Sequence, residues 1–132
     1  MKNPLLSAAL LLTGIVASAC ASSPMAATTG RLNHVGLVWL EEPGNEADRQ
    51  RLIDAAHAFA QEIPEVRRLS VGVALPLESP LADSSFDLCF VMEFDDRAAL
   101  DRYAQHPVHA KAAQEAFLPL ARKLLFYDFV AE

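Results

Sequence analysis

Large apolar residues lie on both faces of two predicted strands, and this pattern constrains the fold more than any other feature of the sequence. The two segments are residues 32–40 and 124–130. In the second segment, Leu124 and Phe126 point to one face, whereas Leu125 and Tyr127 point to the other. A sheet with one face in water alternates apolar and polar residues. These strands therefore predict a sheet that is covered on both faces.

The spacing of apolar residues predicts strands and helices in the order β-α-β-β-α-β. Period-two alternation indicates the strands, and apolar positions three and four residues apart indicate the helices. The second helix is expected to break before Pro107, because a proline disfavours helical geometry in the residue before it. This order predicts an α+β fold with a ferredoxin-like antiparallel sheet and both helices on one face. The predicted strands are 32–40, 69–75, 86–94 and 124–130, and the predicted helices are 45–63 and 96–118.

The second face of the predicted sheet needs a cover of its own. Two copies of the chain packed sheet to sheet would remove several hundred square ångströms of apolar surface from water, which predicts a homodimer. The alternative is a monomer in which the C-terminal tail or the Pro/Ser-rich loop at 76–85 folds over that face.

Length and charge limit the other possibilities. A chain of 132 residues is enough for one domain. The formal net charge is −6, and the only adjacent basic pairs are Arg67-Arg68 and Arg122-Lys123. Binding to nucleic acid depends on clustered Lys and Arg, so nucleic acid is not expected as a partner.

The first residues have the pattern of a secretory leader. Lys2 precedes the apolar run 5–16, and small residues at 17–19 precede Cys20. We expect a signal peptide over 1–19, lipidation of Cys20 as in bacterial lipoproteins, a tether over 20–30 and a domain over 31–132. The expected location is the cell envelope, anchored to a membrane through acyl chains and facing the periplasm. Cleavage by an ordinary signal peptidase would instead give a soluble periplasmic protein.

Several short motifs together resemble the Dabb family, the stress-responsive dimeric α/β-barrel domains. The resemblance spans about residues 31–130 and implies a dimeric α/β barrel with a cavity between the sheet and the helices. Its most specific part is the H-P-x-H element that follows a helix bearing a tyrosine. The motifs are Asn33-His34-Val35, Ile63-Pro64 with Gly72, Phe86-Asp87-Leu88, Tyr103 with His106-Pro107-Val108-His109, and Leu124-Leu125-Phe126-Tyr127-Asp128-Phe129.

The resemblance also implies candidate catalytic residues. A polyketide cyclase of the olivetolic acid type in this family closes its substrate by aldol condensation without a metal or an organic cofactor. Its catalytic residues match His109 and Tyr103, and a further cavity histidine matches His34. A histidine that titrates near pH 6.5 is suited to act as the base at neutral pH. A phenol hydroxyl can polarise the carbonyl oxygen.

Structural roles are the alternative for the same residues. Tyr103 would then pack in the core, His106 would cap the helix that starts at Pro107, and His109 would bind a backbone carbonyl. His106-x-x-His109 also has a plausible metal-ligand spacing, but no Cys or converging carboxylate accompanies it, so no metal is expected. Cys89 lies in an apolar run and is interpreted as a small buried hydrophobe, with a reactive thiol as the alternative.

Two functions follow as hypotheses. The first is a binding or stress-associated module for a small apolar or aromatic compound. The second is a cofactor-free enzyme, either a lyase that resembles the cyclase or a dimeric-barrel monooxygenase. The first predicted helix has Ala56 and His57 where the cyclase has bulky residues that shape its pocket, so a different ligand is expected. His57 is expected at the solvent edge of that helix.

Overall fold

The computed structural model describes residues 30–132. The predicted signal peptide, Cys20 and the rest of the tether up to residue 29 lie outside the described residues. Within the described part, strands and helices follow the predicted order. The elements are β1 (Leu32–Leu40), α1 (Glu46–Glu62), β2 (Arg68–Gly72), β3 (Leu88–Phe94), α2 (Arg97–Ala104), α3 (Pro107–Ala112), the π-helical segment η1 (Ala113–Phe117), α4 (Leu118–Leu120) and β4 (Ala121–Val130).

The four strands form one antiparallel sheet in the order β2-β3-β1-β4. The central strand β1 pairs with β3 on one side and with β4 on the other, so that His34 lies between Met92 and Asp128. Both edge strands, β2 and β4, have one neighbour each. The predicted ferredoxin-like α+β fold is confirmed.

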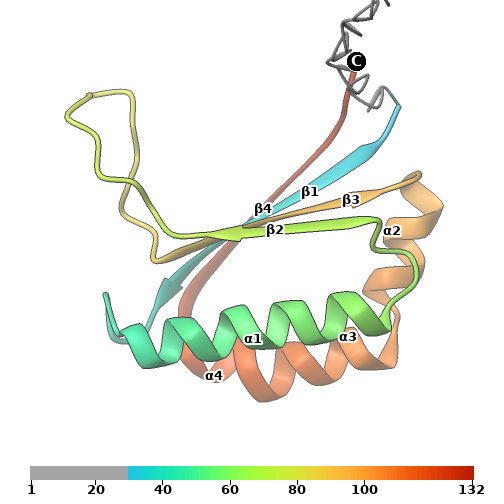
Figure 1. Ribbon diagram of the computed structural model, residues 1–132, viewed down its shortest axis with the longest axis horizontal. Helices are drawn as coiled ribbons and strands as arrows, with labels where there is room; N and C mark the ends of the chain where they lie inside the picture. Colours follow the sequence, from blue (N-terminus) through green and yellow to red (C-terminus); the bar gives the residue numbers. More distant parts are fainter. Residues whose placement is uncertain (1–29) are drawn as a thin grey trace, which may run out of the picture.

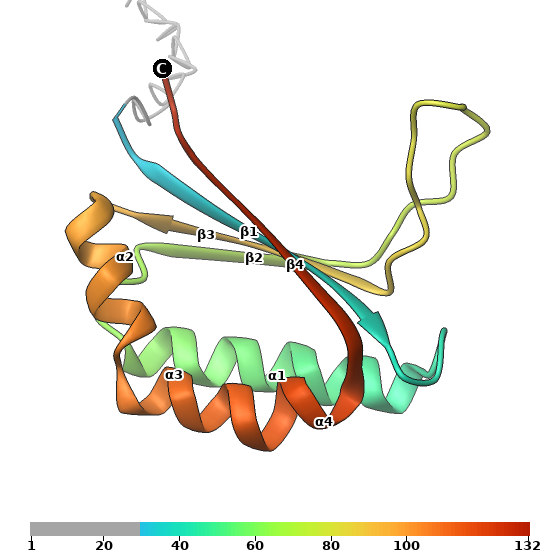
Figure 2. The same ribbon diagram turned by 180° about the vertical axis from the view of Figure 1, so that it is seen from behind.

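The helices form a single layer on one face of this sheet (Figures 1 and 2). Asn45 caps α1 by accepting a hydrogen bond from the backbone N–H of Asp48. Leu52, Ala56 and Phe59 of α1 are buried against the sheet. The facing strand residues are also buried, and this contact forms the core: Leu32, Val38, Leu40, Leu88, Phe90, Met92 and Phe94.

The opposite face of the sheet, which we call the open face, has no helix over it (Figure 1). Val35 pairs with Val91 and Tyr127 on this face. Val35 and Val91 are only half-buried and Tyr127 is exposed. The expectation of apolar residues on both sides of the sheet is therefore met, and the described residues leave one side largely uncovered. No helix in this part of the chain has the length and apolar content needed to cross a bilayer.

The observed bounds differ from the predicted ones where pairing is lost. β2 ends at Gly72 rather than at residue 75, because its last paired residue faces Cys89 and β3 begins at Leu88. A strand that has no neighbour to bond with does not continue as a strand. The helix after Pro107 also contains the π-helical segment η1, which an apolar period of 3.6 residues cannot reveal.

Candidate functional site

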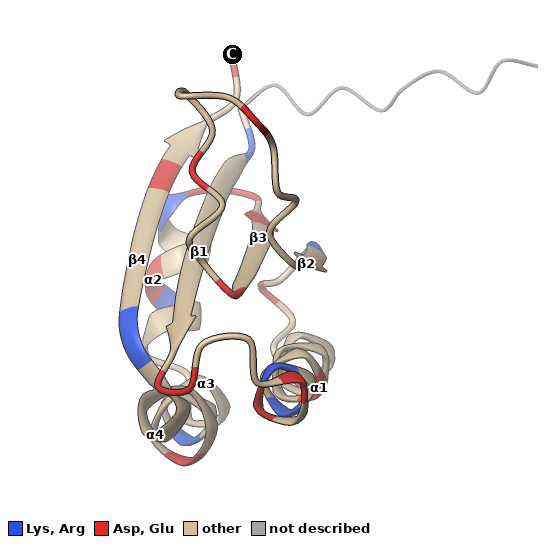
Figure 3. Cartoon of the chain, turned by 90° about the vertical axis from the view of Figure 1, so that its left-hand side faces the viewer, with Lys and Arg blue, Asp and Glu red and all other residues tan. Residues whose placement is uncertain are grey.

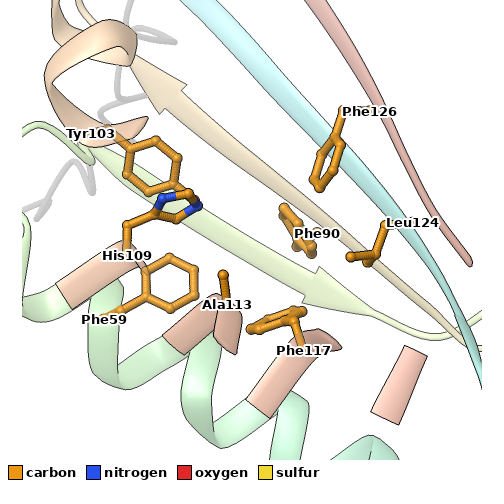
Figure 4. Close-up of a pocket in the computed structure, with 8 residues that line it drawn as sticks. All are labelled: Phe59, Phe90, Tyr103, His109, Ala113, Phe117, Leu124 and Phe126. Atoms are coloured by element: carbon orange, nitrogen blue, oxygen red, sulfur yellow. The ribbon is translucent and has the colours of Figure 1, made fainter. Parts of the chain in front are cut away.

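A small cavity lies between the sheet and the helix that follows Pro107. Its volume is about 50 Å³, which is room for a few water molecules. Its wall is mostly aromatic (Figure 4). A mostly apolar wall with few polar groups is typical of ligand sites, and this cavity is smaller than the usual pocket of about 300–1,000 Å³. The lining residues are Phe59, Phe90, Tyr103, His109, Ala113, Phe117, Leu124 and Phe126.

His109 supplies an imidazole to this wall from α3. In Figure 4 its ring projects between the rings of Tyr103 and Phe59 towards Phe90. The Nδ1 atom lies 3.3 Å from the backbone oxygen of Ala104, and since a carbonyl can only accept, Nδ1 is the donor. In the neutral ring the Nε2 atom then keeps its lone pair. Burial lowers the pKa of His109, so the neutral ring is the prevailing form at pH 7.

Tyr103 reaches the same cavity from α2. Asp96 begins this helix by accepting a hydrogen bond from the backbone N–H of Ala99, and the helix ends before Pro107 as expected. The ring centroid of Tyr103 lies 4.4 Å from that of His109. The Tyr103 side chain is buried, and burial raises the pKa of its hydroxyl, which therefore stays protonated and able to donate.

His34 stands next to this pair on β1. Its ring stacks on Phe126 at a centroid distance of 5.1 Å and lies 6.0 Å from the ring of Tyr103. His34 does not line the cavity itself. It contacts the rings of Phe126 and Tyr103, which do line it. The three residues named from the sequence therefore lie together, and a catalytic role for them stays a prediction.

Asp128 is a partner of His34 that the sequence analysis did not single out. Its Oδ1 atom lies 2.7 Å from Nδ1 of His34, and the carboxylate accepts this hydrogen bond. The bond fixes the ring orientation and leaves Nε2 of His34 with the lone pair when the ring is neutral. One signal was present in the sequence, because Asp128 is the single acid in an otherwise apolar strand segment, 124–130.

The remaining candidates take structural positions. His106 caps α3 by accepting a hydrogen bond from the backbone N–H of Val108, at 3.3 Å from Nδ1. His57 is exposed on α1. Cys89 is half-buried on the open face, and burial raises the pKa of its thiol, which disfavours the reactive thiolate. Among the described residues, no group of three or more His, Cys, Asp or Glu side chains is placed to hold a metal ion.

Most aromatic residues of the cavity wall were not predicted from the sequence as part of the site. Phe59, Phe90 and Phe117 belong to three different elements, and only the folded chain brings them together. Ala113 and Phe117 are the first and last residues of η1. Such π-helical turns occur frequently at functional sites. Here the small side chain of Ala113 keeps the space beside His109 open (Figure 4).

Comparison with known protein families gives one match that covers most of the chain. The family model described as Stress responsive A/B Barrel Domain, or Dabb, matches residues 32–131. No curated protein matches the chain.

Solved structures with the same fold include proteins from bacteria and plants. A Dabb family protein with a ferredoxin-like fold from Mesorhizobium loti is 27% identical, with a TM-score of 0.64, and the match covers 79% of this chain and 99% of that one. A dimeric ferredoxin-like protein of unknown function from a Jannaschia species is 25% identical, with a TM-score of 0.60 and coverage of 76% and 98%. The hydroxynitrile lyase of Passiflora edulis is 15% identical, with a TM-score of 0.68 and coverage of 77% and 94%, and shows the fold alone.

These matches cover nearly the whole of each solved chain. The matched unit therefore folds without additional domains in those proteins. Residues 30–132 of this chain contain the same unit with its core, so they are suited to experiments as a separate domain.

Proposed function

From the premise that the chain belongs to the Dabb family of stress-responsive A/B barrel domains, we propose that it binds a small aromatic or apolar compound in the cavity beside His109. The domain does so as a homodimer, exported and tethered to the envelope membrane through a lipid on Cys20. Relatives in this fold include proteins of unknown function and a hydroxynitrile lyase, so family membership alone does not decide between binding and catalysis.

One observation carries the binding proposal, namely an aromatic wall with one imidazole acceptor. Rings from Phe59, Phe90 and Phe117 offer faces and edges for contact with another ring. Nε2 of His109 is free to accept a hydrogen bond, since Nδ1 is held by Ala104. A compact aromatic compound with a hydroxyl group satisfies both features, and with a volume of about 50 Å³ the cavity must widen to admit even one ring.

Phenol and toluene provide a matched pair of probes for this proposal. They share shape and differ in one hydroxyl, which in phenol can donate to Nε2 of His109. In NMR titrations of residues 30–132, we expect phenol to shift the methyl resonances of Ala113 and Leu124. We expect toluene to bind about fivefold or more weakly, as the loss of one hydrogen bond of about 1 kcal/mol implies.

The variant His109→Leu removes the acceptor and places an apolar side chain at that position. It should abolish the preference for phenol, while His57→Leu, at an exposed histidine of α1, should retain it. If neither probe shifts the two methyl resonances, or if the preference survives in His109→Leu, the proposed binding mode is wrong.

The homodimer rests on the open face of the sheet. Apolar residues of this face, such as Val35 and Val91, lie half-buried with no cover among the described residues, and a second copy would remove them from water. The Jannaschia relative is described as dimeric, which supports a dimer. Light scattering of residues 30–132 at micromolar concentration should give the mass of two chains, and the mass of one chain would contradict it.

The anchor rests on the sequence pattern at residues 17–20. In a bacterial host, the full chain should be recovered in the membrane fraction with an acyl modification at Cys20 that mass spectrometry detects. The variant Cys20→Ser should leave that fraction. If it stays with the membrane, the lipoprotein assignment is wrong.

A second candidate function, cofactor-free catalysis, is favoured by the grouping of His109 and Tyr103 with the oriented His34. The carboxylate of Asp128 orients His34, and the Tyr103 ring lies 6.0 Å from the ring of His34 and 4.4 Å from that of His109. In this mechanism, Nε2 of His109 takes a proton from the carbon next to a carbonyl group. The Tyr103 hydroxyl donates a hydrogen bond to the carbonyl oxygen as it gains negative charge.

Proton exchange on a simple aromatic ketone tests this chemistry. The base removes a methyl proton from acetophenone and, in D2O, returns a deuteron, so the methyl signal decays in the NMR spectrum. We expect decay faster than in buffer for the parent domain and at the buffer rate for His109→Ala and Tyr103→Phe. If the methyl signal of acetophenone decays at the buffer rate with the parent domain, the catalytic proposal is wrong and only the binding function remains.

A further inference from the structure

The apolar alternation of β2 continues past the end of the strand. Leu69 and Val71 of β2 point to the helical layer and pack against the core. Val73, Leu75 and Leu77 follow at the same period of two, and all are more than half exposed. Leu81 is 96% exposed. We call residues 73–86 the arm. Its first residues have the pattern of a strand, and no strand lies beside them in the described chain.

The arm leaves the body of the domain on the side of the open face. Figures 1 and 2 show it rising from the sheet away from the helical layer. Its returning end is fixed, because Asp87 accepts hydrogen bonds from the backbone N–H groups of Leu40 and Gly44. Ser85 also accepts a hydrogen bond from the indole of Trp39, a residue that lies opposite Lys123 on β4. The arm therefore has a firm base and an exposed apolar tip.

The strand β4 offers a matching surface. It is an edge strand of ten residues that pairs only with β1. Phe126 lines the cavity and is nevertheless 46% exposed, and Tyr127 and Phe129 are about half exposed. An edge strand with exposed apolar residues is a ready template for pairing with another chain. The cavity is thus bordered by an edge that nothing in the described chain covers.

Strand directions decide which edges can meet in a pair of sheets. β1 is antiparallel to both β3 and β4, and β2 is antiparallel to β3, so β2 and β4 run in opposite directions. A twofold axis parallel to the strands places β2 of one copy beside β4 of the other in antiparallel orientation. The continuation of β2, which is the arm, then lies beside the first half of the partner's β4.

We propose that the arm of one copy lies along the β4 edge of a second copy, where its leucines cover Phe126 and close the cavity of that copy. This inference rests on the homodimer proposed above. Charge is compatible with the second copy as the occupant, since the arm carries Glu78 and β4 begins with Arg122 and Lys123 (Figure 3). Asp83, the other acid of the arm, already interacts with Lys123 of its own copy. The same two acids disfavour insertion of the arm into a bilayer.

Substitution of the arm leucines tests the inference in residues 30–132. Leu75 and Leu77 are exposed in a single copy, so Leu75→Ser/Leu77→Ser should leave the fold intact, as circular dichroism can verify. In analytical ultracentrifugation we expect its dimer dissociation constant to rise at least tenfold. Leu118→Ser, at a leucine of α4 that is 59% exposed, is the matched control and should leave that constant unchanged.

A fluorescent reporter tests closure of the cavity separately from dimer strength. In a Phe126→Trp background, compared with the parent domain to subtract Trp39, the added indole should emit at shorter wavelength in the dimer. The arm substitutions should shift this emission to longer wavelength even at concentrations that keep the dimer saturated.

The possible results distinguish failure of the arm proposal from failure of the homodimer proposal. A parent domain that sediments as a single chain overturns both proposals. If the parent is a dimer and the arm substitutions change neither its dissociation constant nor the indole emission, only the proposal for the arm is wrong. If the leucines are instead needed for binding to vesicles of phosphatidylethanolamine and phosphatidylglycerol while the dimer is unaffected, the arm is a membrane contact and the inference is wrong.

Discussion

His109 has one ring nitrogen bound to the protein and the other free towards the cavity. Ala104 holds Nδ1 through its backbone oxygen, and burial lowers the pKa of His109 below its ordinary value of 6.5. An unfolded chain takes up a proton at this residue near pH 6.5, whereas the folded chain takes it up only at lower pH. Stability is therefore complete above pH 6.5 and falls as the pH drops through the pKa of the folded state.

This linkage predicts a measurable difference between two histidine variants. Urea unfolding at pH 7.5 and pH 5.0 should show that the parent domain loses stability at the lower pH. The loss should be smaller in His109→Gln, and His57→Gln, at an exposed histidine, serves as the control. A loss that is identical in the parent and in His109→Gln would contradict the assignment of a lowered pKa to His109.

Asp128 fixes the tautomer of His34 through a hydrogen bond of 2.7 Å. Long-range 15N–1H NMR spectra should show a proton on Nδ1 of His34 in the parent at neutral pH. In Asp128→Ala the preference for this tautomer should be lost, while Asp101→Ala, which removes a surface carboxylate paired with Arg97, should leave it unchanged. A tautomer that persists in Asp128→Ala would show that other contacts orient His34.

The candidate site was only partly predictable from the sequence. The resemblance in the H-P-x-H element indicated His109 and Tyr103, and the structure places their rings 4.4 Å apart. The pair of His34 and Asp128 is separated by 94 positions. Its contact follows from the register of β1 against β4, which no local pattern encodes.

Within the elements, Gly36 of β1 keeps room for the cavity wall. A methyl group on Gly36 would overlap the ring of Phe90, whereas a methyl group on Gly72 of β2 would meet nothing within 4 Å. Gly36→Ala should therefore cost about 1–3 kcal/mol of unfolding free energy and weaken phenol binding, because the ring of Phe90 must move. Gly72→Ala should change stability by less than about 0.5 kcal/mol. Urea unfolding of both variants checks this, and equal effects would contradict it.

Asp87 joins two connections that are distant in sequence. Its carboxylate accepts hydrogen bonds from the backbone N–H of Leu40, at 2.9 Å, and from that of Gly44, at 2.7 Å. Asp87→Ala leaves both donors without this partner and should lower the unfolding free energy by about 1–3 kcal/mol. Asp54→Ala, on the exposed surface of α1, should change it by less than about 0.5 kcal/mol. Denaturant unfolding that ranks the two variants equally would show that Asp87 is not a structural link.

Elements were predictable where their pattern is local. The alternation of β1 and β3 and the Asn45 cap of α1 were sufficient to place these elements, to within two residues for the start of β3. The end of β2 was not predictable, since it depends on where β3 begins. The π-helical turn η1 was also not predictable. The residues of Ala113–Phe117 are compatible with an ordinary α-helix, and only the pattern of backbone hydrogen bonds distinguishes the two.

For the whole molecule, the deciding feature is a sheet that is apolar on both faces and covered on one. β3 lies inside the sheet, and its residue Val91 faces the open side next to Val35 of β1. In a pair of sheets packed face to face, a carboxylate at this position would lose its water without gaining a partner. Val91→Glu should therefore raise the dimer dissociation constant more than tenfold and leave a folded single copy.

Light scattering and sedimentation of residues 30–132 measure this change, with circular dichroism to confirm that the variant is folded. Leu118→Glu provides the matched control, because it adds the same charge at an exposed leucine of the helical layer. If Val91→Glu stays a dimer with the parent's affinity, the two copies do not meet through the open face. The cover for the apolar side of the sheet must then come from a different partner, and the pairing that seats the arm on β4 loses its basis.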